Sequence, residues 1–209
     1  PTISIIGSDA SNFSVSTSPS TSISSSSNTT FAITFTPTST GTKNANVIIS
    51  NNDSDENPYS FAITGNCITP EIIVEGNNVE ITDGSTTTST SDNTNLGSIR
   101  TGNSSSATFK ISNTGTGTLN LSGTPTINIS GTHASDFTVT SAPSTSIGTS
   151  SNSTFDIQFT PSATGTRNAT VTIANNDVDE SSYTFNISGT GIEPIIPIKG
   201  NGNVISTND

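Results

Sequence analysis

Hydrophobic and polar residues alternate along most of this 209-residue chain. The period of two recurs in short runs between residues 109 and 187, and each run places its apolar side chains on one face of a strand. No segment shows the i, i+3, i+4, i+7 spacing of an amphipathic helix, so the pattern predicts an all-β fold with helices absent or limited to a single turn. The apolar pairs and triplets are Phe109 and Ile111, Leu119 and Leu121, Ile127 and Ile129, Phe137 and Val139, Phe155, Ile157 and Phe159, Val171 and Ile173, and Phe185 and Ile187.

A first strand with a kink precedes these runs. Residues 72–74 and 79–81 are its two apolar parts, and Gly76, Asn77 and Asn78 supply a turn between them. Seven to nine short strands over about 120 residues, each apolar on one face, are typical of an immunoglobulin-like sandwich of two packed sheets. The Cys and Trp hallmarks of antibody domains are missing.

The chain also repeats itself. A shift of 124 positions, from Pro1 to Pro125, aligns residues 1–66 with 125–190 without a gap, and 39 of the 66 pairs are identical. The repeat predicts tandem homologous domains. We expect residues 1–66 to be the C-terminal part of one immunoglobulin-like repeat, 67–70 a linker, 71–191 a complete repeat, and 192–209 a linker with the first strands of a following repeat. This pattern is typical of a window cut from a longer tandem array.

A family resemblance rests on residues 131–191, GTHASDFTVTSAPSTSIGTSSNSTFDIQFTPSATGTRNATVTIANNDVDESSYTFNISGTG. This run resembles the choice-of-anchor D repeats of bacterial surface and secreted proteins, which are related to ASH and hydin-type immunoglobulin-like domains. The most specific parts are the DF at 136–137, FxPxxxGxRxAxVxIxNND from 159 to 177, and YTFxIxGTG from 183 to 191. The first copy departs from it, with Asn12 aligned to Asp136, Asp9 to His133, and Asn66-Cys67 to Thr190-Gly191.

The resemblance implies fold and context rather than activity. Such repeats are typical of long, multi-domain extracellular proteins, often from Bacteroidetes-type bacteria. No catalytic residue travels with the family, so the resemblance implies none here.

The amino-acid composition excludes some classes of binding partner. Only 28% of residues are hydrophobic and 10% charged, and Ser, Thr and Asn take the place of the missing apolar residues, which suits strands with one wet face and polar turns. Five Lys plus Arg stand against 16 Asp plus Glu, for a formal net charge of −11. Without a basic stripe a nucleic-acid partner is excluded, and without a long apolar run no membrane insertion of this segment is expected.

Two acidic runs, NNDSDE at 51–56 and NNDVDE at 175–180, are the candidate chemical sites. Ca²⁺ takes six to eight oxygen ligands, and alternating carboxylates on a tight turn could supply several of them. The alternative is a turn before the last strand, in which Asp177 caps its own backbone and the charges stay in water. The possible calcium ligands are Asp53, Asp55, Glu56, Asp177, Asp179 and Glu180.

Other polar features carry weaker signals. His133 is the only histidine, so a histidine-based zinc site or triad within this chain is excluded. Cys67 is the only cysteine and is interpreted as a free thiol in the linker. Asp83 and Asp92 lie in a long Ser/Thr segment, residues 83–97, that could contribute oxygens to a calcium site or contact a ligand.

The sequence therefore predicts a non-enzymatic structural repeat, a stalk, spacer or filament-forming module of an extracellular bacterial surface protein or adhesin. No cofactor is expected, with Ca²⁺ the possible exception. The expected partners are neighbouring repeats of the same polypeptide, with self-association into filaments or cell-surface contacts possible. The alternatives are a glycan- or protein-binding domain acting through residues 83–97 and an accessory domain of a secreted hydrolase.

Overall fold

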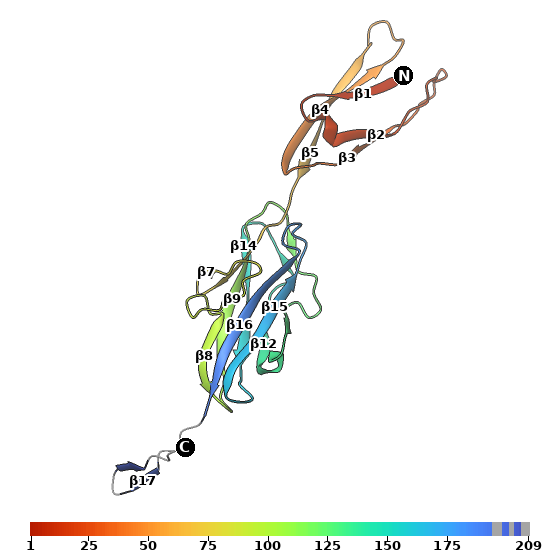
Figure 1. The fold of residues 1–209 in the computed structure, drawn as a ribbon. Helices are drawn as coiled ribbons and strands as arrows, with labels where there is room; N and C mark the ends of the chain where they lie inside the picture. Colours follow the sequence, from red (N-terminus) through yellow and green to blue (C-terminus); the bar gives the residue numbers. More distant parts are fainter. Residues whose placement is uncertain (194–197, 201–202, 206–209) are drawn as a thin grey trace. The chain divides into compact units, whose positions relative to one another are not determined.

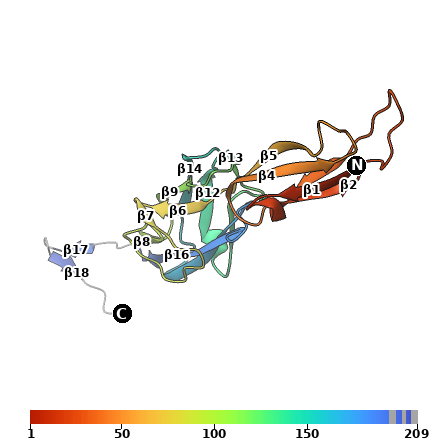
Figure 2. The ribbon, with the colours of Figure 1, turned by 90° about the horizontal axis from the view of Figure 1, so that it is seen from above.

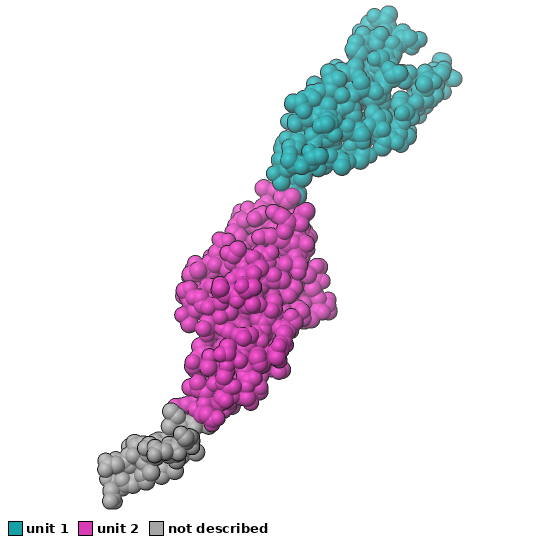
Figure 3. All heavy atoms as spheres, in the orientation of Figure 1, with its two compact units in different colours: residues 1–68 teal, residues 69–209 magenta. Residues whose placement is uncertain are grey.

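The computed structural model describes residues 1–193, 198–200 and 203–205. It divides into two compact units, Pro1–Ile68 (unit 1) and Thr69–Asp209 (unit 2), which are coloured separately in Figure 3. The described residues contain strands and two single-turn 3-10 helices, η1 (Ala10–Asn12) and η2 (Ala134–Asp136), and no α-helix, so the predicted all-β class is confirmed. The predicted start of a further repeat, residues 192–209, lies partly outside the described residues.

Unit 2 is built on two sheets, which Figures 1 and 2 show from two directions. The five-stranded sheet has the order β12-β14-β9-β6-β7 and the four-stranded sheet the order β11-β15-β16-β8. A short pair, β10 with β13, and the hairpin β17-β18 complete it. The strands are β6 (Ile72–Gly76), β7 (Val79–Glu80), β8 (Asn95–Arg100), β9 (Ser105–Asn113), β10 (Leu119–Asn120), β11 (Asn128–Ser130), β12 (Phe137–Ser141), β13 (Ser146–Ile147), β14 (Ser151–Phe159), β15 (Gly165–Ala174), β16 (Ser182–Ile192), β17 (Ile198–Gly200) and β18 (Asn203–Ile205).

The core of unit 2 lies between these sheets and includes most of the predicted alternating residues, whereas Ile129 and Val139 are only partly buried. Phe109 stacks on Phe155 within one sheet, with ring centroids 5.2 Å apart, and reaches Phe185 of the other sheet at 5.7 Å. Phe137 stacks on Phe159 at 4.9 Å. All five rings are buried. Because each apolar face is covered by the opposite sheet, unit 2 is a β-sandwich of the predicted immunoglobulin-like class.

The sequence pattern predicted the turn after β6 but did not predict strand β8. Asn77 and Asn78 have φ of 51° and 61°, so the predicted turn between the halves of the first strand is a tight β6-β7 hairpin. By contrast, the segment 83–97, expected to be a loop, leads into β8, which pairs parallel with β16. Gly97, with a φ of 84°, interrupts the alternation there, so the strand was missed.

Unit 1 reproduces the second half of unit 2 in the same register. Ile5 pairs with Val47 as Ile129 pairs with Val171, and Phe13 pairs with Phe35 as Phe137 pairs with Phe159. Its sheets have the orders β1-β4-β5 and β2-β3. Nothing in unit 1 corresponds to β6–β9, so its second sheet has two strands instead of five. The strands are β1 (Thr2–Ile6), β2 (Phe13–Thr17), β3 (Ala32–Phe35), β4 (Gly41–Ser50) and β5 (Tyr59–Cys67).

Candidate functional site

The NND loop of unit 2, residues 175–181, joins β15 to β16 and is organised by its first asparagine. Asn175 Oδ1 accepts a hydrogen bond from Asp177 N at 2.7 Å, and its Nδ2 donates to Glu180 O at 2.8 Å and to Ile173 O at 3.2 Å. A side chain that bridges its own loop in this way replaces backbone hydrogen bonds that a tight connection cannot make. The loop is therefore a locally determined turn, as predicted.

The side chains of the next two residues of the loop, Asn176 and Asp177, form hydrogen bonds with segments that are distant in the sequence. Asn176 Oδ1 accepts from Asn120 N at 2.6 Å, and its Nδ2 donates to Thr118 O at 3.1 Å. Asp177 Oδ2 accepts from Ile72 N at 2.9 Å, across 105 residues. We call residues 70–124 the first half of the repeat and 125–190 its second half. Asn176 and Asp177 therefore form a clasp between the two halves.

The burial of Asp177 corrects one expectation. The turn interpretation left its charge in water and its side chain bonded to its own backbone, but only 2% of Asp177 is exposed and its partner is β6. The prediction missed this because Ile72 is far away in the sequence. A buried backbone N–H without an acceptor is costly, and a charged acceptor satisfies it well.

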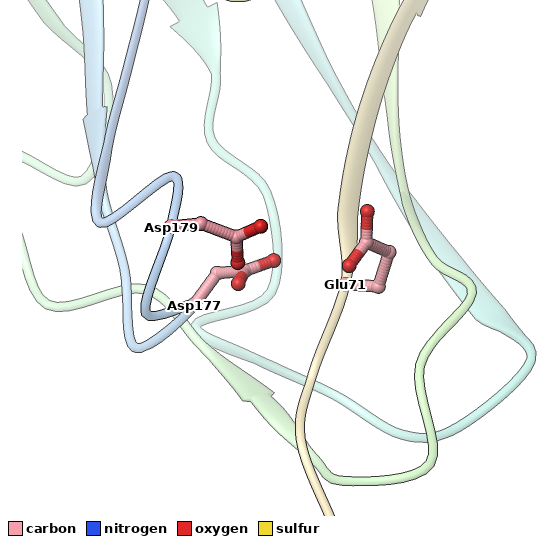
Figure 4. Close-up of side chains that lie close together, drawn as sticks. All are labelled: Glu71, Asp177 and Asp179. Atoms are coloured by element: carbon pink, nitrogen blue, oxygen red, sulfur yellow. The ribbon is translucent and has the colours of Figure 1, made fainter. Parts of the chain in front are cut away.

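Three carboxylates converge beside the clasp (Figure 4). One oxygen from each of Glu71, Asp177 and Asp179 lies within 4.8 Å of the others, and within the described residues this is the one such group of three. Glu71 was not among the predicted ligands, because it stands directly before β6, more than 100 residues away from Asp177 in the sequence. Glu180 is outside the group, and Asp53, Asp55 and Glu56 of unit 1 form none.

The cluster is electrostatically strained. Burial, and then the charges of Asp177 and Asp179, raise the pKa of Glu71. Burial also raises the pKa of Asp177, against the opposing hydrogen bond from Ile72. The pKa of Glu180 is raised by burial and by its acidic neighbours, with Glu71 the largest charge contribution. Such a group favours protons or a cation. The calcium hypothesis for Asp177 and Asp179 remains a prediction, with Glu71 added as a third donor.

Residues 83–97 lie along the side of β16 opposite to β15 and lead into β8. Asp83 Oδ1 accepts from Thr184 N at 2.6 Å, Asn186 N donates to Ser85 O at 2.9 Å, and Ser188 N donates to Thr94 O at 2.8 Å. Asp92 Oδ1 accepts from the amide and hydroxyl of Thr94. Covering a sheet edge prevents its pairing with other chains. One oxygen each of Asp83 and Asp92, the carboxylates suggested for calcium binding in this segment, is thus engaged within the unit.

Asp136 of the DF motif and Arg167 of the FxPxxxGxR motif lie close together in the structure. Arg167 Nε lies 3.5 Å from Asp136 Oδ2, which is buried, and also donates to Ala163 O. His133 Nδ1 accepts from Asn168 N at 3.1 Å. In unit 1, Asp9 Oδ2 accepts from Asn44 N at 3.0 Å, so two different residue types serve the same backbone amide. These residues brace the start of β15 and β4, which is a structural role.

Comparison with known proteins supports the immunoglobulin-like fold of unit 2. Residues 88–190, from before β8 to near the end of β16, match the family model described as HYDIN/CFA65/VesB-like, Ig-like domain. The search of curated protein sequences found no match. Within the described residues, no helix is both long and apolar enough to span a membrane.

Three solved structures are among those that match the chain at low similarity. The ASH/PapD-like domain 7 of human CEP192 is 18% identical, with a TM-score of 0.36 over 49% of this chain and 84% of that one. A Porphyromonas gingivalis W83 protein of unknown function is 13% identical, with a TM-score of 0.44 over 90% of this chain and 84% of that one. The VesB protease of Vibrio cholerae is 15% identical, with a TM-score of 0.35, and the match covers 46% of this chain and 29% of the protease.

Proposed function

We propose that this chain is a non-enzymatic structural module, a run of tandem immunoglobulin-like repeats that acts as a stalk or spacer in a long extracellular bacterial surface protein. The resemblance to choice-of-anchor D repeats supports the extracellular setting. The repeat itself supports the structural role. The second copy of the acidic loop contains the clasp of Asn176 and Asp177 inside the sandwich. A structural role of this kind explains why the loop is repeated without any catalytic function.

The connection between the units is the observation that carries this proposal. β5 ends at Cys67, and Thr69 is already bound within unit 2, where its carbonyl accepts from Thr116 N and Gly117 N at 2.8 Å each. A Cβ on Gly115 would lie 2.4 Å from the same carbonyl, so only glycine allows this loop to approach. A single residue, Ile68, separates the two attachments. A connection this short suits a spacer, because it restricts independent motion.

The restriction continues into β6. Glu71 N donates to Asn113 Oδ1 at 3.2 Å, and Thr114 N donates to Glu71 O at 2.9 Å. Pro70, which joins Thr69 to Glu71, is buried. Asn113 also donates to Gly117 O and Ile147 O, so it joins the linker to two loops. Pro194, the equivalent of Pro70 in the next predicted linker, lies outside the described residues.

Backbone ¹⁵N relaxation tests the spacer role. In the native chain we expect both units to report one common rotational correlation time. A variant with six Gly/Ser residues inserted after Ile68 serves as the control, and its units should tumble separately. Separate correlation times in the native chain, equal to those of the insertion variant, would contradict a stiff spacer.

An accessory domain of a secreted hydrolase is the second candidate, favoured by the family description that names VesB for residues 88–190. This role requires a catalytic domain elsewhere in the same polypeptide. Deleting the repeats from that parent protein would then change substrate binding or secretion while leaving hydrolysis of a small soluble substrate intact. An unchanged parent protein would remove this candidate.

A further inference from the structure

A small polar hollow opens on unit 2, where the chain leaves β11 and turns into η2. Its volume is about 250 Å³, and its walls include residues of β15 and β16, which run side by side in Figure 1. Sites for drug-sized ligands measure roughly 300–1,000 Å³, so this hollow suits a single ring-sized group. Its polar lining consists of Thr132, His133, Asn168, Thr170 and Asn186.

The lining carries no acidic, lysine or arginine side chain, although the chain has 16 acidic residues. A charged ligand would therefore have no opposite charge to pair with in the hollow. The other lining residues are Gly131 and Ala169, so an apolar ligand would have no large apolar side chain to pack against. The hollow is thus suited to a ligand that is neutral and rich in hydrogen-bonding groups.

The edge of β15 beside the hollow is already paired. His133 N donates to Asn168 O at 3.3 Å, and Asn168 N donates to His133 Nδ1 at 3.1 Å. Both backbone groups of Asn168 are occupied, so a peptide cannot add to β15 as another strand at this point. Because Nδ1 accepts, the hydrogen of the neutral imidazole lies on Nε2, which is a donor without a partner among the described residues.

Four further polar groups have capacity for a ligand. The Thr132 hydroxyl and the Asn168 amide line the hollow and, within the described part of the chain, have no side-chain hydrogen bond. Thr170 Oγ1 donates to Asn186 Oδ1 at 2.8 Å and can still accept. Asn186 Nδ2 donates to Thr86 O at 3.4 Å and has a second hydrogen. Donors and acceptors are therefore mixed in the lining, and a sugar hydroxyl is both.

Unit 1 keeps the scaffold of this region but not its polar groups. Asp9 accepts from Asn44 N as His133 accepts from Asn168 N, so the fold tolerates a carboxylate in place of the imidazole. The fold therefore does not require the set of side chains found in unit 2, which points to a property specific to that unit. The aligned exchanges are Ser8 for Thr132, Asp9 for His133, Asn46 for Thr170 and Ala62 for Asn186.

We propose that this hollow binds a neutral sugar, one ring of hexose size at the end of a glycan. His133 Nε2, the Asn168 amide and Asn186 Nδ2 donate hydrogen bonds to the sugar hydroxyls, and the Thr132 and Thr170 hydroxyls accept from them. No Phe, Tyr or Trp lines the hollow to stack on the ring, so we expect a dissociation constant of about 1–10 mM. The inference holds whether or not the chain is a spacer.

An NMR titration of the full chain tests the site. The ¹⁵N-labelled protein is titrated separately with D-galactose, D-mannose and N-acetyl-D-glucosamine, and the amide chemical shifts are followed. We expect at least one sugar to shift the amides of residues 131–133, 168–170 and 186 along one saturable curve. The aligned residues 7–9, 44–46 and 62 provide the internal control and should not move. No saturable shift with any of the three sugars, or equal shifts in both units, would overturn the proposal.

Matched variants assign the binding to the lining residues. Asn168→Ala removes one hydrogen-bonding side chain and should weaken binding about fivefold, whereas Asn44→Ala, the same change in unit 1, should leave the affinity unchanged. Should Asn168→Ala fail to fold, Asn186→Ala gives unit 2 the residue that unit 1 has at Ala62 and should weaken binding similarly. Native affinity in a folded variant of either kind would overturn the proposal.

Discussion

Unit 1 and the second half of unit 2 have closely similar sequences and the same strand register, yet their residues lie in different environments. Phe13 and Phe35 stack at 4.9 Å, the same distance that separates Phe137 and Phe159. In contrast, Phe61 is 37% exposed, while its equivalent Phe185 is 1% exposed against Phe109. Contacts within the second half are thus retained and contacts with the first half are missing. Local strand pairing is encoded in 66 residues, but the core requires both halves.

The largest expected difference concerns the buried aromatic pair. Phe185→Ala should lower the free energy of unfolding of unit 2 by about 3–5 kcal/mol, because it leaves a cavity in a closed core. Phe61→Ala, the matched change, should cost unit 1 less than about 1 kcal/mol, because that ring is already partly in water. Each unit has one tyrosine, so ¹⁹F NMR of fluorotyrosine-labelled protein follows both units in one denaturant titration. Equal losses would refute the comparison.

The clasp provides the next largest difference. Asp177→Ala should destabilise unit 2 by about 1–3 kcal/mol, because Ile72 N is left buried without an acceptor. Asp177→Asn keeps an acceptor and removes a repelled charge, so it should cost much less. Asp53→Ala should change unit 1 by less than about 0.5 kcal/mol, as expected for an exposed side chain. Urea unfolding of the three variants separates these cases, and a large effect of Asp53→Ala would count against the clasp assignment.

Calcium should also distinguish the units. If Glu71, Asp177 and Asp179 bind Ca²⁺, chelation should lower the melting temperature of unit 2 by several degrees and leave unit 1 unchanged. Asp179→Asn should abolish the response, because it removes a ligand without removing the hydrogen bond to Ile72. Scanning calorimetry with added Ca²⁺ and with EDTA measures the effect. No shift in the native chain would eliminate the calcium hypothesis.

The smallest expected effect is on pH dependence. A carboxyl whose pKa is raised by folding binds its proton more tightly in the folded than in the unfolded state. The unfolding free energy of unit 2 should therefore fall as pH rises above the ordinary carboxyl range through the raised pKa values of Glu71, Asp177 and Glu180. In unit 1, the hydrogen bonds from Asp55 lower the pKa of Asp53, so its smaller contribution has the opposite sign. Melting curves between about pH 4 and pH 8, without Ca²⁺, compare the slopes, and Asp179→Asn should flatten that of unit 2.

Much of the fold could be predicted from sequence because strand alternation is a local signal. Most of the predicted apolar positions from Phe109 to Ile187 belong to the observed core, and the repeat predicted the shared register. β8 was missed because its pairing with β16 is parallel and distant, and only Leu96 and Ile99 mark it. The candidate site was predicted in part: Asp177 and Asp179 lie two positions apart in the sequence, whereas Glu71 and Ile72 come close to them only in the folded sandwich.

Native-state hydrogen exchange of this chain tests most directly whether the aligned last strands of the two units lie in a closed core in unit 2 and in a more exposed environment in unit 1. The comparison is between β16, residues 182–192, and its copy β5, residues 59–67. We expect the amides of β16 to exchange at least about 100-fold more slowly, because they open only when the closed core opens. Equal exchange rates in the two strands would contradict this account.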